Sequence, residues 1–207
     1  MSSDKRWVLS AIPEGTGHAL DLGGGRGELH SPLKSRGYTY VNLDYRPSEG
    51  NRSVRGDATR LPFADSSFNL VVSSDSLEHF TDPQDVVREV RRILTPGGTF
   101  VIWVPFMHPF HSDDYFRYTP IGLRLLIGRA GLEFVRLESP LWIFSVSAQM
   151  VVVILRQLHL GFLERVVERI GYALDRVFRR FRSADAGFAA FYLVVAHRPD
   201  GPPSPVK

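Results

Sequence analysis

The chain has 207 residues, no cysteine and a formal net charge of +3 at pH 7. This length suits one well-buried domain and is too short for two typical ones. The absence of cysteine excludes a disulfide framework and a thiolate metal site, and 43% hydrophobic with 23% charged residues argues against a largely disordered chain.

The first ten residues contain no apolar run of signal-peptide length, so we expect a cytoplasmic protein. Residues 5–17 are expected to form a short helix or loop ahead of the first strand.

Residues 18–27 (HALDLGGGRG) predict a strand, a glycine-rich turn and a helix. In such a turn a ligand can lie against the backbone, and the amides at the helix start favour negative charge. Gly23, Gly25 and Gly27 are spaced i, i+2, i+4, and Glu28 stands where the dinucleotide fingerprint needs its third glycine. The spacing therefore disfavours a nicotinamide oxidoreductase.

Asp21 bears on which ligand the turn holds. Its negative charge would repel a phosphate and attract an ammonium group, directly or through water. A ligand with an amino acid end, a ribose and a base fits better than a diphosphate. S-adenosylmethionine is such a ligand, with its amino group near Asp21 and its carboxylate near the turn amides.

Strand and helix patterns alternate along the following residues. Asp82 and Thr119 are placed to cap two of the helices, and each is followed by a proline at the first helical position. We expect helices at 28–36, 83–94 and 120–130, and strands at 38–44, 53–55, 70–72, 99–104, 132–137 and 189–196.

In this order the motifs resemble those of class I (Rossmann-like) S-adenosylmethionine-dependent methyltransferases of the small "type 11" kind. The resemblance rests on DLGGGRG at 21–27, VNLD at 41–44, GDA at 56–58, LPFADSSFNLVVSSDSLEHF at 61–80 and REVRRILTPGGTFVIWVP at 88–105. It covers about residues 16–138 and the final strand. It implies one α/β domain over 1–198, with a seven-stranded, mostly parallel sheet of order 3-2-1-4-5-7-6 whose last strand is antiparallel.

The resemblance also implies where the cofactor is held. Asp44, at the end of the second strand, is expected to accept hydrogen bonds from the ribose, and Asp57 from the exocyclic amine of adenine. The plain alternatives are a surface-loop aspartate at 44 and a helix N-cap at 57. The residues expected to contact S-adenosylmethionine are Asp21, Gly23, Gly25, Gly27, Asp44, Asp57, Ala58, Ser74 and Asp75.

His79 follows the buried strand 70–72, at the sheet edge where open α/β sheets place their ligands. It is a candidate general base. The alternative is a hydrogen-bonded residue that fixes its loop.

The segment 108–120 (HPFHSDDYFRYTP) concentrates functional side chains after a strand at the same edge. We expect His111 or Asp113 to deprotonate an acceptor hydroxyl. Similar stretches ending in Arg-Tyr-Thr-Pro occur in methyltransferases associated with glycan biosynthesis, which suggests a small-molecule or lipid-linked saccharide acceptor. The residues expected to bind that acceptor are His108, Tyr115, Arg117 and Tyr118.

Two alternatives remain for this segment. One is a divalent metal held by His108, His111 and Asp113, for which no recognised spacing exists, so no metal is expected. The other is a loop pinned by hydrogen bonds and an Arg117 ion pair.

About fifty residues separate the last two strands, where the family normally has a tight connection, so we expect a helical insertion at about 140–184. Its first part, 139–155, is uncharged but shorter than a membrane-spanning helix. Its second part, 156–182, is amphipathic and carries seven arginines against three acids. We expect it to meet an anionic membrane surface, peripherally at the inner face, with core packing or a dimer face as the alternatives. Nucleic acid is not expected, and the tail 199–207 is expected to be disordered.

These patterns predict a methyltransferase that acts on a small-molecule or lipid-linked acceptor, with a saccharide hydroxyl as one candidate. The alternatives are a catalytically inactive membrane-associated scaffold that retains the fold, and a quinone or lipid C-methyltransferase. The residues do not determine the oligomeric state.

Overall fold

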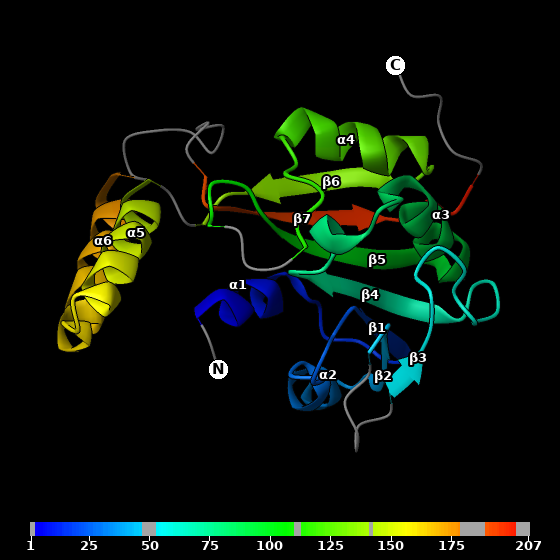
Figure 1. Cartoon of the computed structure of the whole chain (residues 1–207). Coiled ribbons are helices and arrows are strands. Elements are labelled where there is room, and N and C mark those ends of the chain that lie inside the picture. Colours follow the sequence, from blue (N-terminus) through cyan, green and yellow to red (C-terminus); the bar gives the residue numbers. More distant parts are fainter. Residues whose placement is uncertain (1–2, 47–52, 110–112, 141–142, 179–188, 202–207) are drawn as a thin grey trace.

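In the computed structural model, a seven-stranded sheet carries helices on both faces (Figure 1). The structure describes residues 3–46, 53–109, 113–140, 143–178 and 189–201. The strands are β1 (His18–Leu22), β2 (Thr39–Asp44), β3 (Ser53–Arg55), β4 (Phe68–Ser74), β5 (Leu94–Pro105), β6 (Glu133–Glu138) and β7 (Phe191–His197). The helices are α1 (Ser3–Ala11), α2 (His30–Ser35), α3 (Pro83–Ile93), α4 (Pro120–Arg129), α5 (Ile143–Gln157) and α6 (Glu164–Phe178), with short 3-10 turns η1 (Leu77–His79) and η2 (Gly161–Leu163).

The strand order is β3-β2-β1-β4-β5-β7-β6, which confirms the predicted sheet. The pairs from β3 to β5 are parallel, and β7 is antiparallel to both of its neighbours. The carboxyl ends of the parallel strands therefore meet at one edge, where ligands bind in sheets of this kind.

Two apolar layers cover the two faces of the sheet. On β5, Phe100, Ile102 and Val104 pack with α3 and α4, while Val101 and Trp103 pack with α1 and α2. This alternation follows from the two-residue period of a strand. Because both faces are covered, the central strands are mostly apolar, and Asp21, Asp44 and Ser74 lie at or near their carboxyl ends.

The element boundaries differ from the predicted ones in a few places. β4 begins at Phe68 and extends to Ser74, and β5 already begins at Leu94, directly after α3. Thr119 caps α4, because its side chain accepts a hydrogen bond from the Gly122 amide at 3.0 Å. The prediction that the Asp82 side chain caps α3 was wrong. The Asp82 carboxylate caps no amide of α3 and instead accepts a 3.0 Å hydrogen bond from the Thr81 hydroxyl.

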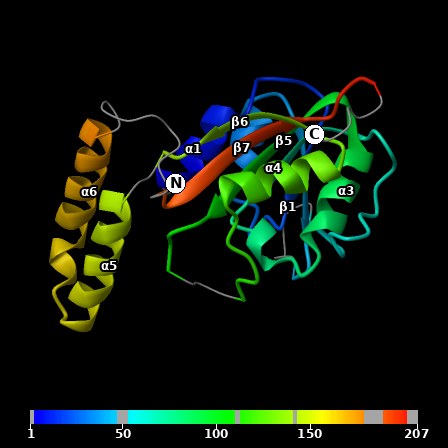
Figure 2. The same cartoon turned by 90° about the horizontal axis from the view of Figure 1, so that it is seen from above.

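The insertion between β6 and β7 forms a helical hairpin, α5 and α6, that stands beside the sheet instead of covering it (Figures 1 and 2). Among the residues that the structure describes, no helix has the length and apolar character needed to cross a membrane. Residues 141–142 and 179–184 of the expected insertion, and the expected tail from 202 onward, lie outside the described residues.

Candidate active site

Two adjoining cavities lie at the carboxyl ends of β1, β2 and β4. The larger, of about 670 Å³, is lined by five of the residues expected at the cofactor: Gly23, Asp44, Asp57, Ala58 and Asp75. The smaller, of about 240 Å³, shares Gly23 and Asp75 with it and adds Asp21, Gly25 and Ser74. Gly27 lines neither cavity, and its amide closes the turn on the Gly24 carbonyl at 2.8 Å.

The glycine-rich turn is held from β2. Gly23 and Gly25 have positive φ angles of 71° and 50°, which residues with side chains adopt only at a cost. The Gly25 amide donates to Asp44 Oδ2 at 2.9 Å, and the Gly25 carbonyl accepts from buried Asn42 Nδ2 at 3.1 Å. Sequence patterns did not identify Asn42, because an amide inside an apolar strand shows its partner only in the folded sheet.

Asp21 lies beneath the turn, only 2% exposed. Burial raises the pKa of its carboxyl to about 6, although the Tyr40 hydroxyl donates to Oδ2 at 2.8 Å and acts in the opposite direction. Lys5 of α1 lines the same small cavity and forms an ion pair with Glu28. The small cavity thus offers a carboxylate and an ammonium group together. That pair is complementary to the two charges of a free amino acid end.

Asp44 and Asp57 both line the larger cavity, and both already hold backbone groups. Asp44 Oδ1 accepts from the Arg46 amide at 2.7 Å. Asp57 Oδ1 accepts from the amide and the hydroxyl of Thr59 at 2.8 Å each, which lowers the pKa of Asp57. The helix N-cap considered for Asp57 is not formed, because these bonds close a turn at 58–59 and no helix begins there; Asp57 holds that turn and also lines the cavity.

The end of β4 is tied to the end of β1 by two serines. Ser76 Oγ donates to the Leu22 carbonyl at 2.7 Å and lies 2.6 Å from Ser73 Oγ. Asp75 between them has a φ of 51°, unusual for a residue with a side chain, and its amide donates to the Trp103 carbonyl at 2.9 Å. Strain of this kind is typical of functional sites.

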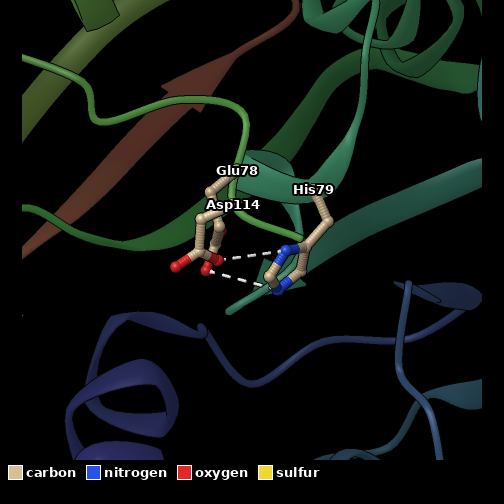
Figure 3. A group of neighbouring side chains, drawn as sticks. All are labelled: Glu78, His79 and Asp114. Carbon is tan, nitrogen blue, oxygen red and sulfur yellow. Dashed lines mark ion pairs between the residues drawn. The ribbon is translucent and has the colours of Figure 1, made fainter. Parts of the chain in front are cut away.

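His79 contacts two acidic side chains at the rim of the larger cavity (Figure 3). Its Nδ1 lies 3.2 Å from Asp114 Oδ1 and 3.2 Å from the Asp113 carbonyl oxygen. The Asp113 carbonyl oxygen can only accept a hydrogen bond, and Asp114 also pairs with the Arg117 guanidinium at 2.7 Å. Nδ1 must then carry the proton of the neutral ring, which leaves the lone pair on Nε2.

Glu78 completes this cluster from the buried side. One of its carboxyl oxygens lies 3.9 Å from His79 Nε2. Burial, with smaller contributions from the charges of Asp75 and Asp114, raises the pKa of Glu78 to about 8, so it is largely protonated at neutral pH. Sequence patterns missed Glu78, because nothing in the SLEHF motif distinguishes a buried glutamate from a solvated one.

The cluster of Glu78, His79 and Asp114 could in principle hold a metal ion, since one ligand atom of each lies within 4.8 Å of the others. The chemistry favours another role. The Arg117 cation, 2.7 Å from Asp114, opposes a second positive charge at this cluster. The arrangement suits the transfer of a proton to or from His79.

The residues of the segment that was expected to bind the acceptor have different locations in the structure. Asp113 and Tyr115 line the larger cavity. Tyr118 is buried, and its hydroxyl donates to the Leu77 carbonyl at 3.0 Å, while Arg117 is engaged by Asp114. His108 lines neither cavity and lies against Phe191, with ring centres 4.8 Å apart. His111 lies outside the described residues.

Arg117 and Tyr118 therefore hold this segment in place, as the pinned-loop alternative predicted for Arg117. The Tyr115 amide also donates to the Glu78 carbonyl at 2.9 Å. As a result, Asp113 and Tyr115 are fixed at the cavity mouth.

The chain was compared with known proteins. Residues 20–102 match the family model of a methyltransferase domain. An uncharacterized methyltransferase of Mycobacterium sp. (strain KMS) is 37% identical over 105 residues, which cover 46% of this chain and 42% of that protein. A demethylmenaquinone methyltransferase of Renibacterium salmoninarum is 32% identical over 139 residues, covering 61% and 58%. The chain thus spans about half the length of the curated relatives it matches.

A solved structure shows the same fold. The S-adenosylmethionine-dependent methyltransferase from Mesorhizobium loti superposes with a TM-score of 0.63 at 20% identity, over 95% of this chain and 98% of that one. Residues 20–102 therefore resemble a methyltransferase domain, and the chain has the same Rossmann-like fold as that solved methyltransferase.

Proposed function

We propose that this protein transfers the methyl group of S-adenosylmethionine to a hydroxyl group of a small-molecule or lipid-linked acceptor. The observation that carries the proposal is the pair of adjoining cavities at the carboxyl ends of β1, β2 and β4. They place Asp21 and Lys5 at one end, Asp44 and Asp57 at the other, and His79 at the rim.

The cavities fit the cofactor in both size and polarity. The adenosine would occupy the larger cavity, with its ribose hydroxyls at Asp44 and its adenine amine at Asp57. The amino acid end would occupy the smaller one, with its ammonium group toward Asp21 and its carboxylate toward Lys5 and the turn amides. The sulfonium would then lie near Gly23 and Asp75, which the two cavities share.

The cofactor supplies a methyl carbon that the sulfonium has already activated. The protein's part is to align the acceptor oxygen with that carbon and to exclude water. When the acceptor oxygen takes up the methyl group, the hydroxyl proton that it loses would pass to His79 Nε2. Asp114 keeps the other ring proton on Nδ1 and stabilises the imidazolium that results.

For the acceptor we propose a saccharide hydroxyl on a small or lipid-linked molecule, and for the protein a peripheral location at the inner face of a membrane. Asp113 and Tyr115 at the cavity mouth are proposed to contact the acceptor. The predicted roles of His111 and Asp113 in catalysis and of His108 in acceptor binding stay predictions.

A second candidate is C-methylation of a quinone. It is favoured by the relative from Renibacterium salmoninarum, whose name is demethylmenaquinone methyltransferase. The quinone ring would reach the same edge of the sheet, and its hydroxyl would need the same base.

Two measurements test the proposed function. Titration calorimetry is expected to give a micromolar dissociation constant for S-adenosylmethionine. The protein is then incubated with methyl-labelled cofactor and separate glycolipid, soluble glycan and quinone fractions, and products are identified by mass spectrometry. Label in a sugar ether supports the first candidate and label on a quinone ring the second. If the cofactor does not bind, both are wrong.

Variants of His79 and Asp114 test the assignment of the base. His79→Gln is expected to lower kcat about 100-fold, and Asp114→Asn about ten-fold, with the cofactor dissociation constant unchanged in both. Nitrogen-15 spectra of the His79 ring should show the proton on Nδ1 in the parent protein. The exposed Asp85→Asn, on α3, serves as the control and should behave like the parent protein. A proton on Nε2, or full activity in His79→Gln, would contradict the assignment.

A further inference from the structure

The seam of the α5–α6 hairpin contains small and polar residues beside the buried Val152. A Cβ atom built on Gly171 would lie 2.7 Å from the Ala148 Cβ and 2.8 Å from the Phe144 carbonyl, so the two helices approach closely there. Asp175 is 2% exposed in the same seam and accepts hydrogen bonds from the amides of Phe144 and Ser145 at 3.2 and 3.1 Å. Around Gly171 and Asp175 the seam is therefore built from small side chains and hydrogen bonds, and large apolar residues such as Val152 fill only part of it.

The opposite face of α6 carries the large apolar side chains. Val166, Ile170, Leu174 and Val177 recur at spacings of four, four and three residues, which places them on one side of the helix. They are 38 to 54% exposed. Because Gly171 and Asp175 occupy the seam, this apolar stripe points away from α5.

α5 and the connection between the helices continue the apolar surface. Met150, Val151, Val153 and Ile154 of α5 are 42 to 54% exposed, and Leu158 and Phe162 near the tip are 62 and 76% exposed. The ion pair of Arg156 with Glu164, 2.9 Å, joins the helices close to that tip. The hairpin thus presents bulky apolar side chains along both helices, in the part of the molecule that lies farthest from the sheet (Figures 1 and 2).

This arrangement is costly in water and stable in lipid. Each exposed apolar side chain forgoes the free energy that burial would give, about 25 cal/mol per Å². In a lipid environment, by contrast, helices associate through small residues and hydrogen bonds, and their bulky apolar side chains face the acyl chains. The seam with Ala148, Gly171 and Asp175 follows that second pattern.

Charge on α6 indicates which kind of lipid surface fits. Arg165, Arg169 and Arg176 are exposed and recur at spacings of four and seven residues, so they form a row along one flank of the apolar stripe. A helix that lies flat in a membrane interface places its apolar stripe among the acyl chains and its cations among the headgroups. Anionic headgroups would attract this row. Neither helix is long enough to span a bilayer, so insertion would occur from one side.

We propose that the α5–α6 hairpin inserts into one leaflet of an anionic membrane, with its outer apolar surface among the acyl chains and the arginine row at the phosphates. The proposal rests on the peripheral location proposed above. It goes further by naming both helices and their outer faces as the contact surface. It also places the hairpin deeper than the surface attraction of its arginines would. The apolar side chains of α5 enter the acyl region of the membrane.

The absence of cysteine permits a direct test on the full chain. Single-cysteine variants Ile154→Cys and Ile170→Cys receive an environment-sensitive fluorophore. Val135→Cys on β6, also apolar and 48% exposed, serves as the matched control. On addition of phosphatidylglycerol–phosphatidylcholine vesicles, the labels at 154 and 170 should gain at least two-fold in intensity and shift to the blue, whereas the label at 135 should not change. No response at 154 and 170, or an equal response at 135, would overturn the proposal.

Charged substitutions provide the second test. The double variant Ile154→Asp with Ile170→Asp should sediment with these vesicles at least ten-fold more weakly than the parent protein, and Val135→Asp should sediment normally. Light scattering without lipid measures the oligomeric state, because a second copy of the chain could cover the same apolar face. A dimeric parent protein that becomes monomeric in the double variant would show that a second copy covers this face, and would overturn the proposal. Cofactor affinity, measured in every variant, should stay unchanged, so failure of the proposed enzyme activity is recognised separately.

Discussion

Asp44 shows how one side chain can shape a ligand cavity and line it. One carboxylate oxygen accepts from the Gly25 amide of the turn and the other from the Arg46 amide, and the same side chain lines the larger cavity. A carboxylate oxygen has two lone pairs, so each can accept a further hydrogen bond from a ribose hydroxyl.

Asp44→Ala should raise the dissociation constant of S-adenosylmethionine about 10- to 100-fold, because a hydrogen bond to a charged group is worth about 1.5 to 3 kcal/mol. Titration calorimetry measures this effect. Asp85→Ala, which removes an exposed carboxylate paired with Arg88, is the control and should bind normally. A dissociation constant within two-fold of the parent value would rule out Asp44 as a cofactor ligand.

Glu78 links the stability of the protein to pH. Its pKa rises from 4.5 in the unfolded chain to about 8 in the folded one, so folding favours the protonated form. The stabilising effect is complete below pH 4.5 and is lost as the pH rises toward 8. Glu78→Gln stays neutral throughout. Thermal or urea unfolding should therefore find the variant similar to the parent at pH 5 and more stable by about 2 kcal/mol or more at pH 8.

A second glutamate gives the opposite sign and serves as the control. The pKa of Glu89 is lowered, chiefly by its hydrogen bond with Arg92, so its stabilising effect is present near neutral pH and is lost on acidification. Glu89→Gln should be less stable than the parent protein at pH 7 and approach it at low pH. Parallel pH profiles for Glu78→Gln and the parent would mean that Glu78 is ionised at neutral pH.

At the scale of elements, two glycines of the glycine-rich turn have different roles. Gly23 is expected to matter for the stability of the fold, and Gly25 for cofactor binding. A Cβ atom at position 23 would lie 2.6 Å from the Ser76 Cβ, and Ser76 holds the Leu22 carbonyl. A Cβ atom at position 25 would meet nothing within 4 Å and would enter the smaller cavity. The two positions share the left-handed backbone and differ in their surroundings.

Gly23→Ala should destabilise the fold by about 2 to 3 kcal/mol, since the left-handed conformation and the close contact with Ser76 both cost energy. Gly25→Ala should cost about 1 kcal/mol and weaken cofactor binding more than it weakens the fold. Urea unfolding and calorimetry on both variants compare the two effects. If Gly25→Ala bound the cofactor as the parent does, the smaller cavity would not hold its amino acid end.

At the scale of the whole molecule, the hairpin and the sheet have separate roles. Most of the α5–α6 hairpin stands away from the sheet, and its main contacts with it come from Val146 and Tyr172, which pack with the apolar layer on the α1 side. The two cavities proposed to hold the cofactor lie at the carboxyl ends of β1, β2 and β4 and are lined by no hairpin residue.

Replacement of residues 141–188 by a short turn between β6 and β7 should leave the cofactor dissociation constant within three-fold of the parent value. The midpoint of thermal unfolding should fall by several degrees, because the contacts of Val146 and Tyr172 are lost. Vesicle binding should disappear. Loss of cofactor binding in a folded variant would show that the hairpin supports the site.

Local patterns determined much of this protein. The strand–turn–helix that begins at residue 18 was predicted correctly, because strand and turn formation depend on neighbouring residues and on two-residue and 3.6-residue periods. The sheet order was implied by the resemblance to a known family, and the structure confirms it. Eight of the nine residues expected at the cofactor line one of the two cavities, since they follow strands whose carboxyl ends meet at one edge.

Only the tertiary structure decided what covers each face and which side chains meet. Glu78 and Asp114 are separated by 36 positions, and no period relates them, so their contacts with His79 arise when the 113–118 segment folds back over η1. The periodicity of α6 likewise reveals an apolar stripe, but not that Gly171 and Asp175 would take the seam and leave the stripe outside. Periodicity shows which residues share one face of a helix. Whether that face is buried depends on residues that are distant in the chain.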